Sequence, residues 1–184
     1  MPQEKWEAIQ ARDRAMLCIF YGCGLRRNEG ESLDVDDIDF DKGLVHVRAG
    51  KGNKERMVPV SKSSLKHLQS YVYDHRSNLL YCHHAPHRSV PNRKGALFIS
   101  YNHVNRMQGQ GLLLRLKYLQ YQTGNQELIE REIGLHTLRH SIATHLLQAG
   151  MKLESISRFL GHTSLESTQI YTHIAHYVGE NQEQ

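Results

Sequence analysis

The sequence predicts an α+β fold that is mainly α-helical and contains one small antiparallel β-sheet. Apolar residues recur at helical spacing near the amino terminus and again through the carboxy-terminal third of the chain. Between these regions, two short runs rich in apolar residues, the first of them alternating, flank a glycine-containing segment, the pattern of a β-hairpin. A chain of 184 residues is long enough for one well-buried domain, so we expect residues 1–184 to form a single domain.

The first predicted helix extends from about Glu4 to Tyr21 and ends near residues 22–24, where two of three residues are glycine. A second, short helix is expected to begin at Arg26 or Arg27 and to end at Leu33. The following segment, Asp34–Asp41, is rich in aspartate, and we interpret it as a solvated turn before a strand.

The predicted hairpin has strands at Leu44–Arg48 and Met57–Val60, joined by residues 49–56. The first of these runs alternates as a strand does, and the second is interpreted as the returning strand. The segment Leu97–Ser100 is expected to form a third short strand. The sheet therefore interrupts the helices.

A long polar stretch, residues 74–94, contains Pro86 and Pro91 and has no sustained apolar period, so it is predicted to be a loop or insertion. Gly150 and Gly161 follow predicted helices at the position where a left-handed residue ends a helix. The remaining predicted helices are Ser63–Tyr73, Leu112–Tyr121, Gln126–Ile133, His136–Gln148, Leu153–Leu160 and Leu165–Ile174.

The charge of the chain is concentrated in its middle. The formal net charge is only +4, yet residues 42–117 contain 14 basic and 2 acidic side chains, a local charge of +12. Seven of the 13 histidines lie in the same block, and both flanking segments are acidic. This asymmetry predicts a surface that binds a polyanion.

Composition excludes several classes of protein. With 39% hydrophobic and 23% charged residues, the chain is not disordered by composition. No run approaches the roughly 18–20 apolar residues of a membrane span, and no signal-peptide pattern is visible. The three cysteines lack a spaced framework, which favours a reducing cytoplasm over a disulfide-linked, secreted protein.

Five short motifs occur in order along the chain: GLRRNE at 24–29, GKGNKER at 50–56, HTLRH at 136–140, LGH at 160–162 and IYTH at 170–173. Together they resemble the signature of the tyrosine recombinases, also called phage-type integrases, and most closely the Xer-like and transposon integrase branch. The resemblance extends from about Arg12 to His173. It implies the catalytic-domain fold of that family and a site-specific DNA recombinase or integrase that cleaves and rejoins strands through a 3′-phosphotyrosyl intermediate.

By this resemblance the catalytic residues are Arg26, Lys51, His136, Arg139, His162 and the nucleophile Tyr171. The assignment is chemically consistent, because two guanidiniums can hold the non-bridging oxygens of a phosphodiester as their charge grows in the transition state. His136 lies three residues before Arg139, so both side chains share one helix face.

The remaining roles also follow from the resemblance. A phenol has a pKa near ~10 and needs a base or a strong local field to attack, and His136 matches the family's supporting histidine. Lys51 matches the general acid that protonates the 5′-oxygen leaving group, and His162 matches a second histidine that donates a hydrogen bond to the phosphate. Glu29 is interpreted as a structural partner that orients an arginine.

Each assignment has an alternative in the sequence. Arg27 competes with Arg26 as the phosphate ligand, and Lys54 or Arg56 competes with Lys51 as the acid. The register of the first motif favours Arg26, and Lys54 and Arg56 are more simply contacts to the DNA backbone. Other histidines and tyrosines are interpreted as packing, capping or stacking groups: His140, His145, His173, Tyr101, Tyr118, Tyr121 and Tyr177.

The expected DNA-binding residues are Arg48, Lys54, Arg56 and Lys62. No metal ion and no cofactor are expected. The aspartates of 34–41 are interpreted as a turn, and the cluster Cys82–His87 offers only one dense group of ligands where structural zinc usually needs two spaced pairs. We interpret that cluster as part of a histidine-rich loop near DNA.

The resemblance further implies double-stranded DNA with inverted half-sites as substrate, a homotetramer on DNA for the full-length protein, no membrane partner, and a cytoplasmic, nucleoid-associated location. Because Arg26 lies only 25 residues after Met1, the separate amino-terminal DNA-clamping domain of such proteins is not expected here, and the chain is interpreted as a fragment. The alternative functions are strand relaxation like that of a type IB topoisomerase, and DNA binding without catalysis on a recombinase fold.

Overall fold

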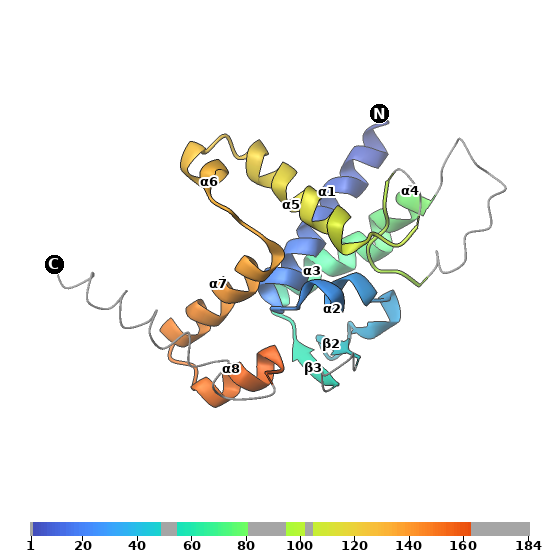
Figure 1. The fold of residues 1–184 in the computed structure, drawn as a ribbon. Helices are drawn as coiled ribbons and strands as arrows, with labels where there is room; N and C mark the ends of the chain where they lie inside the picture. Colours follow the sequence, from blue (N-terminus) through green and yellow to red (C-terminus); the bar gives the residue numbers. More distant parts are fainter. Residues whose placement is uncertain (1, 49–54, 81–94, 102–104, 163–184) are drawn as a thin grey trace.

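The structure, a computed structural model, describes residues 2–48, 55–80, 95–101 and 105–162 (Figure 1). These residues form a mainly helical α+β fold with a small antiparallel sheet, as predicted. The elements are α1 (Gln3–Leu17), α2 (Arg27–Ser32), β1 (Ile38–Asp39), β2 (Leu44–Val47), β3 (Arg56–Pro59), α3 (Lys62–Gln69), α4 (Arg76–Leu80), α5 (Gly109–Gln122), α6 (Gln126–Glu130), α7 (Leu135–Gln148) and α8 (Leu153–Leu160).

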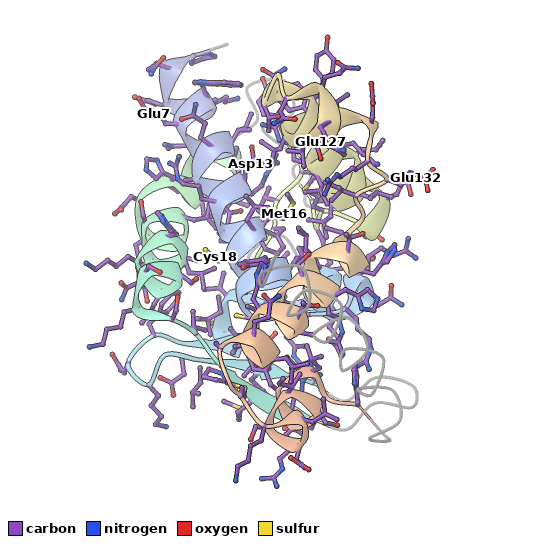
Figure 2. All side chains as sticks on the ribbon, turned by 90° about the vertical axis from the view of Figure 1, so that its left-hand side faces the viewer. Glu7, Asp13, Met16, Cys18, Glu127 and Glu132 are labelled. Atoms are coloured by element: carbon purple, nitrogen blue, oxygen red, sulfur yellow. The ribbon has the colours of Figure 1, made fainter. Side chains whose placement is uncertain are left out.

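Helix α1 occupies the centre of the molecule, with α3 and α4 on one side and α5 on the other (Figure 2). It continues into a π-helical turn, Cys18–Gly22, which packs against α7. Met16, Ile19 and Phe20 are fully buried in the main core. The predicted first helix is thus confirmed, and its π-helical end brings the following residues beneath α7 and α8.

The sheet has the order β1-β2-β3, with both pairs antiparallel. Leu44 pairs with Pro59 and Val47 pairs with Arg56, so the predicted hairpin is confirmed. Val45, Val47 and Val58 turn their side chains into the core. Figure 1 shows the sheet at one end of the molecule, beside α2 and α8. This register places Arg56 at the hairpin-loop end of β3.

The third strand of the sheet is Ile38–Asp39, so the prediction of a strand at Leu97–Ser100 was wrong. The segment around residue 97 is fully buried but makes only isolated bridges, Asp34 to Ala96 and Ile99 to Arg106. Side chains donate hydrogen bonds to its backbone carbonyls instead. Arg76 donates to Ala96 O and Leu97 O, and the Tyr71 hydroxyl also donates to Leu97 O. Arg12 donates to Ile99 O. Buried backbone needs partners, and here arginines supply them.

The acidic segment 34–41 is not a solvated turn, which corrects the interpretation from the sequence. It forms a short 3-10 turn, Val35–Asp37, followed by β1. The Asp37 side chain is 7% exposed and accepts a 2.7 Å hydrogen bond from Arg48 Nε, and Asp34 accepts a 2.8 Å bond from Arg48 Nη2 and a further bond from Arg106. Basic residues distant in the sequence neutralise these carboxylates and fix the turn in the fold.

The helical prediction for residues 63–73 is confirmed but too short, because α3 continues through a π-helical turn into α4 and ends at Leu80. Residues 74–80 are therefore helical, while residues 81–94 lie outside the described residues, as does the predicted helix Leu165–Ile174. The predicted helices of the carboxy-terminal third agree with α5, α6, α7 and α8 to within a few residues. Among the described helices, none is both long and apolar enough to cross a bilayer.

Candidate active site

Four elements converge at the carboxyl end of α8 and define the candidate site. Arg26 precedes α2, Arg56 opens β3, Arg139 lies in the middle of α7, and His162 directly follows the glycine that ends α8. The Glu29 carboxylate, from the first turn of α2, lies between the arginines. Segments far apart in the sequence thus bring three cations around one anion.

Two arginines hold Glu29 directly. Its Oε1 accepts from Arg26 Nη1 at 3.0 Å and from Arg56 Nη1 at 2.9 Å, and its Oε2 accepts from the Arg26 backbone N–H at 2.8 Å and from Arg56 Nη2 at 3.0 Å. Burial alone would raise the pKa of Glu29, but the hydrogen bonds from Arg56 and the Arg26 backbone, with the two positive charges, lower it to about 2. Glu29 is therefore ionised at neutral pH and is unsuited to transfer protons, which agrees with the orienting role expected for it.

The last carbonyls of α8 are bound by the same three arginines, one each. Phe159 O accepts from Arg56 Nε at 3.2 Å, Leu160 O from Arg139 Nη2 at 2.7 Å, and Gly161 O from Arg26 Nη2 at 3.2 Å. The carbonyl end of a helix lacks intrahelical donors and carries partial negative charge, so guanidiniums are favourable partners. These bonds fix the end of α8 against α2, β3 and α7.

Glycine is required where the helix ends. Gly161 has a φ of +66°, and a Cβ at this position would lie 2.8 Å from Arg56 Cδ and 2.9 Å from its Cζ. Gly24 has a φ of +61°, and a Cβ there would lie 2.9 Å from Leu160 Cδ2. The Gly24 carbonyl accepts a 2.6 Å hydrogen bond from Arg139 Nη1. Both motif glycines therefore allow the close approach on which the arginine cluster depends.

The cluster has an excess of positive charge. Three guanidiniums face one carboxylate, which leaves two positive charges among these described groups. The side chain of Arg26 is 34% exposed, while those of Arg56 and Arg139 are 9% and 7% exposed. A phosphodiester carries one negative charge and gains a second on its oxygens during attack at phosphorus, so this site suits a phosphodiester and its transition state.

His162 is neutral at physiological pH in this arrangement. Burial lowers its pKa, and the positive charges of Arg139, Arg26 and Arg56 and the nearby His140 lower it further, to about 4. A neutral imidazole carries one N–H, so it can donate one hydrogen bond to a phosphate oxygen. His162 and the arginines are thus held together before any substrate is present.

NMR titration should show this low pKa and its dependence on DNA. In DNA-free protein, His162 is expected to titrate near pH 4, and a bound phosphate should offset the arginine charges and raise its pKa. Histidine labelled with 15N, with His162→Gln to assign the resonance, measures both states. Titration of His162 at or above pH 6.5 in the free protein would contradict the arrangement described here.

The sign of the effect on stability follows from the same pKa. The folded value, about 4, lies below the ordinary 6.5, so the unfolded chain binds this proton more readily. The contribution of His162 to the free energy of unfolding is therefore constant above about pH 6.5 and falls as the pH drops from 6.5 towards 4. Urea unfolding over this range, compared with His162→Gln, should show a smaller loss in the variant.

Comparison with known proteins decides the family. The profile of the Phage integrase family matches residues 2–177. The chain belongs to this family. Tyrosine recombinase XerC of Chlamydia trachomatis serovar L2 is 39% identical over 164 residues, which are 89% of this chain and 47% of that protein. Tyrosine recombinase XerD of Pseudomonas putida is 38% identical over 169 residues, 92% of this chain and 52% of that protein.

Solved structures agree with this membership. The crystal structure of XerA recombinase superposes with a TM-score of 0.73 at 28% identity and covers 98% of this chain and 61% of its own. The structure of XerH site-specific recombinase bound to a palindromic difH substrate, a post-cleavage complex, has a TM-score of 0.73 at 27% identity and covers 100% of this chain and 47% of its own. The tyrosine recombinase catalytic-domain fold predicted from the motifs is confirmed. The chain spans about half the length of the relatives it matches.

Within this phage integrase family domain, Arg26, Arg139 and His162 meet at the end of α8, as the geometry above shows. His136 lies at the edge of that cluster, and its ring centroid is 6.3 Å from the ring centroid of His140. The charge of His140 in turn lowers the pKa of His162. Lys51 and Tyr171 lie outside the described residues, as do Lys54, the Cys82–His87 cluster, His173 and Tyr177. Their proposed roles therefore still depend on the sequence.

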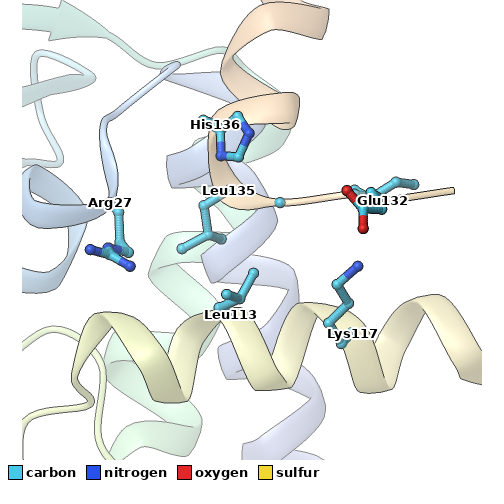
Figure 3. A pocket seen from close by; sticks show the side chains of 8 residues that line it. Arg27, Leu113, Lys117, Glu132, Leu135 and His136 are labelled. Carbon is cyan, nitrogen blue, oxygen red and sulfur yellow. The ribbon is translucent and has the colours of Figure 1, made fainter.

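A groove of about 400 Å³ adjoins His136, between α5 and the start of α7 (Figure 3). Arg27 and Lys117 flank it, and the His136 ring packs over Gly134, where a Cβ would lie 2.9 Å from the imidazole Cε1. Arg27 is exposed, and its aliphatic stem covers Gly109. Arg27, the alternative to Arg26, thus belongs to this groove, while Arg26 contacts Glu29 and Gly161. The full lining is Arg27, Leu113, Lys117, Glu132, Ile133, Gly134, Leu135 and His136.

Two of the expected DNA contacts are bound within the protein. Arg56 is nearly buried and bonds Glu29 and Phe159. Arg48 is half exposed, but its guanidinium is held by Asp34 and Asp37. In both cases a carboxylate from another segment binds the guanidinium. Local sequence patterns could not predict these pairs, because the partners are separated in the sequence. Lys62 is exposed in the first turn of α3.

Several described histidines and tyrosines outside the proposed catalytic set have structural contacts. His145 Nδ1 lies 2.7 Å from the Tyr21 hydroxyl, and the Tyr118 ring lies beneath Arg115 at 4.3 Å. His140 has a pKa lowered by burial and by the charges of His136 and Arg139. The role that sequence reasoning missed is that of Arg56, because no local pattern marks which of three basic residues on a hairpin turns inward.

Proposed function

We propose that this chain is the catalytic domain of a site-specific DNA recombinase that cleaves and rejoins strands through Tyr171. The observation that carries the proposal is the arginine cluster: Arg26 and Arg139, with His162 beside them, form a preorganised site with two excess positive charges. Preorganised charge that is aimed at developing negative charge is usually the largest contribution to such catalysis. Family membership supports the same chemistry.

In the proposed reaction the Tyr171 oxygen attacks phosphorus while the bond from phosphorus to the 5′-oxygen breaks. The phenolic proton leaves towards His136, and Lys51 gives a proton to the departing 5′-oxygen, which becomes a free hydroxyl. The product is a 3′-phosphotyrosyl bond. Attack by a 5′-hydroxyl on this bond reverses the step and releases Tyr171, so no external energy source is needed.

The substrate we propose is double-stranded DNA with inverted half-sites, bound in the cytoplasm by a tetramer of the full-length protein. The XerH relative is described as bound to a palindromic difH substrate, which supports this substrate class. The groove between Arg27 and Lys117, next to His136, offers two cations to phosphates that flank the scissile one. Lys54 and Lys62 remain proposed backbone contacts.

Trapping of a covalent adduct tests the proposed activity. A half-site obtained by in vitro selection is placed in a duplex with a nick just 3′ of the expected cleavage position, so that the released fragment diffuses away and religation fails. A protein–DNA adduct that resists denaturation is the expected result, and mass spectrometry should locate the linkage. Specific binding with no adduct would instead favour the non-catalytic alternative.

A plasmid assay separates recombination from topoisomerase activity. A recombinase exchanges strands only between two half-site pairs, whereas a type IB topoisomerase relaxes any supercoiled plasmid. We expect recombinant products from a plasmid with two sites and no relaxation of a plasmid without them. Relaxation of both plasmids with no exchange would contradict the proposal.

Salt dependence should identify the backbone contacts. The logarithm of the binding constant falls linearly with the logarithm of salt concentration, by about 0.9 for each neutralised phosphate. Lys54→Ala is therefore expected to flatten the slope by about one unit. Lys42 is a suitable control, because it is exposed, pairs with Asp39 and precedes β2 in the sequence, whereas residues 49–54 follow β2. Lys42→Ala should therefore leave the salt slope unchanged. Equal slopes for Lys54→Ala and wild type would remove Lys54 from the interface.

A further inference from the structure

Arg56 occupies a position that the proposed chemistry does not explain. It is the first residue of β3, and its side chain is only 9% exposed. All three guanidinium nitrogens donate to protein acceptors: Nε to Phe159 O at 3.2 Å, Nη1 to Glu29 Oε1 at 2.9 Å and Nη2 to Glu29 Oε2 at 3.0 Å. The fork of Arg56 is thus engaged by both oxygens of Glu29, and its Nε by the end of α8.

One partner of Arg56 also holds Arg26, and the other lies next to the carbonyls that hold Arg139 and Arg26. Glu29 binds the guanidinium and the backbone N–H of Arg26. Phe159 O precedes the carbonyls of Leu160 and Gly161, which accept from Arg139 and Arg26 respectively. Arg56 therefore joins the sheet to α2 and to the end of α8 at the place where the phosphate ligands are fixed.

We propose that Arg56 is a positioning residue, which fixes Glu29 and the carboxyl end of α8 and thereby sets Arg26 and His162 for the phosphodiester, without contacting DNA itself. This inference rests on the proposed function. It explains why the residue is an arginine, since only a planar fork can bind both carboxylate oxygens and still donate from Nε. The Arg56 side chain is also packed closely against the end of α8, because a Cβ on Gly161 would lie 2.8 Å from Arg56 Cδ.

Arg56→Lys tests the proposal because it keeps the charge and removes the fork. A lysine cannot bind Glu29 through two atoms and Phe159 through a third. Displacement of catalytic groups by about 1 Å can lower a rate by roughly 100-fold. We expect single-turnover cleavage at saturating DNA to fall roughly 10- to 100-fold in Arg56→Lys and in Arg56→Gln alike, with DNA affinity and its salt slope unchanged.

A modified substrate separates phosphate positioning from leaving-group protonation. A 5′-bridging phosphorothiolate has a thiolate leaving group that needs no acid, so it should restore cleavage by Lys51→Ala. It should not restore cleavage by Arg56→Lys, because there the defect lies in the phosphate ligands. The matched control is Arg131→Lys, since Arg131 also pairs with a glutamate, Glu127, but on the exposed surface of α6, and this variant should cleave like wild type.

Three results would overturn the proposal. Wild-type cleavage by Arg56→Lys would show that charge alone suffices. A salt slope flattened by about one unit in Arg56→Gln would make Arg56 a phosphate contact. Rescue by the phosphorothiolate would place its action at the leaving group. All rates are measured at a temperature at which circular dichroism shows that each variant is folded. If wild-type protein fails to cleave, that result contradicts the proposed function and not the role of Arg56.

Discussion

Replacing Tyr171 with phenylalanine is expected to abolish the covalent adduct completely while DNA binding stays at the wild-type level. The substitution removes one oxygen atom and keeps the aromatic ring, so only the proposed nucleophile is lost. No other residue can take its place without the same spacing after Gly161-His162. Adduct formation on the nicked substrate and binding by fluorescence anisotropy measure the two quantities.

Two tyrosines provide the controls for this experiment. Tyr121 is well exposed at the end of α5, and Tyr177 lies six residues beyond Tyr171 in the sequence. Tyr121→Phe and Tyr177→Phe should both form adduct at the wild-type rate. Adduct that persists in Tyr171→Phe and disappears in one of the controls would transfer the nucleophile to that residue.

Removal of either proposed phosphate ligand should give the second-largest effect. Arg26→Ala and Arg139→Ala are each expected to lower the cleavage rate by roughly 10²–10³, the usual cost of losing one preorganised donor at a developing oxyanion. Single-turnover rates at saturating DNA measure this effect. The two variants should nevertheless differ in stability, because the side chains lie in different environments.

Arg139 is 7% exposed, and its guanidinium satisfies the carbonyls of Gly24 and Leu160. Its removal leaves these buried acceptors without that donor, at a cost of roughly 1–3 kcal/mol of unfolding free energy for each unsatisfied group. Arg26 is 34% exposed, so water can replace it and Arg26→Ala should be less destabilising. Chemical denaturation measures this contrast. Equal loss of stability in the two variants would contradict the different burial roles assigned to them.

Local patterns predicted the helices well because each one carries its own signals. The apolar period of α1, the glycines after α7 and α8, and the alternation of β2 are all visible in short windows of sequence. The failures have one cause. Asp34 and the segment near Leu97 are neutralised or capped by arginines distant in the sequence, such as Arg106 and Arg76, and no local pattern contains those partners.

The candidate site divides in the same way. The resemblance of the motifs named Arg26, Arg139 and His162, and the structure brings these three together at the end of α8. The position of Arg56 on a basic hairpin suggested a DNA contact, whereas Glu29 and Phe159 bind its side chain within the protein. The direction in which a basic side chain points on a hairpin depends on the acceptors that the tertiary fold brings to it.

The sequence by itself determined the family, the order of most helices with the hairpin between them, and the identity of the residues proposed to act on phosphate. These follow from local periodicity and from motifs that resemble a known family. Only the tertiary structure decided which arginines are bound by protein acceptors and which remain more exposed. The reason is physical: a guanidinium binds whichever carboxylate or carbonyl lies within about 3 Å, and in this protein those partners come from other helices and strands. The basic middle of the chain is therefore partly a structural framework and not solely a surface for DNA.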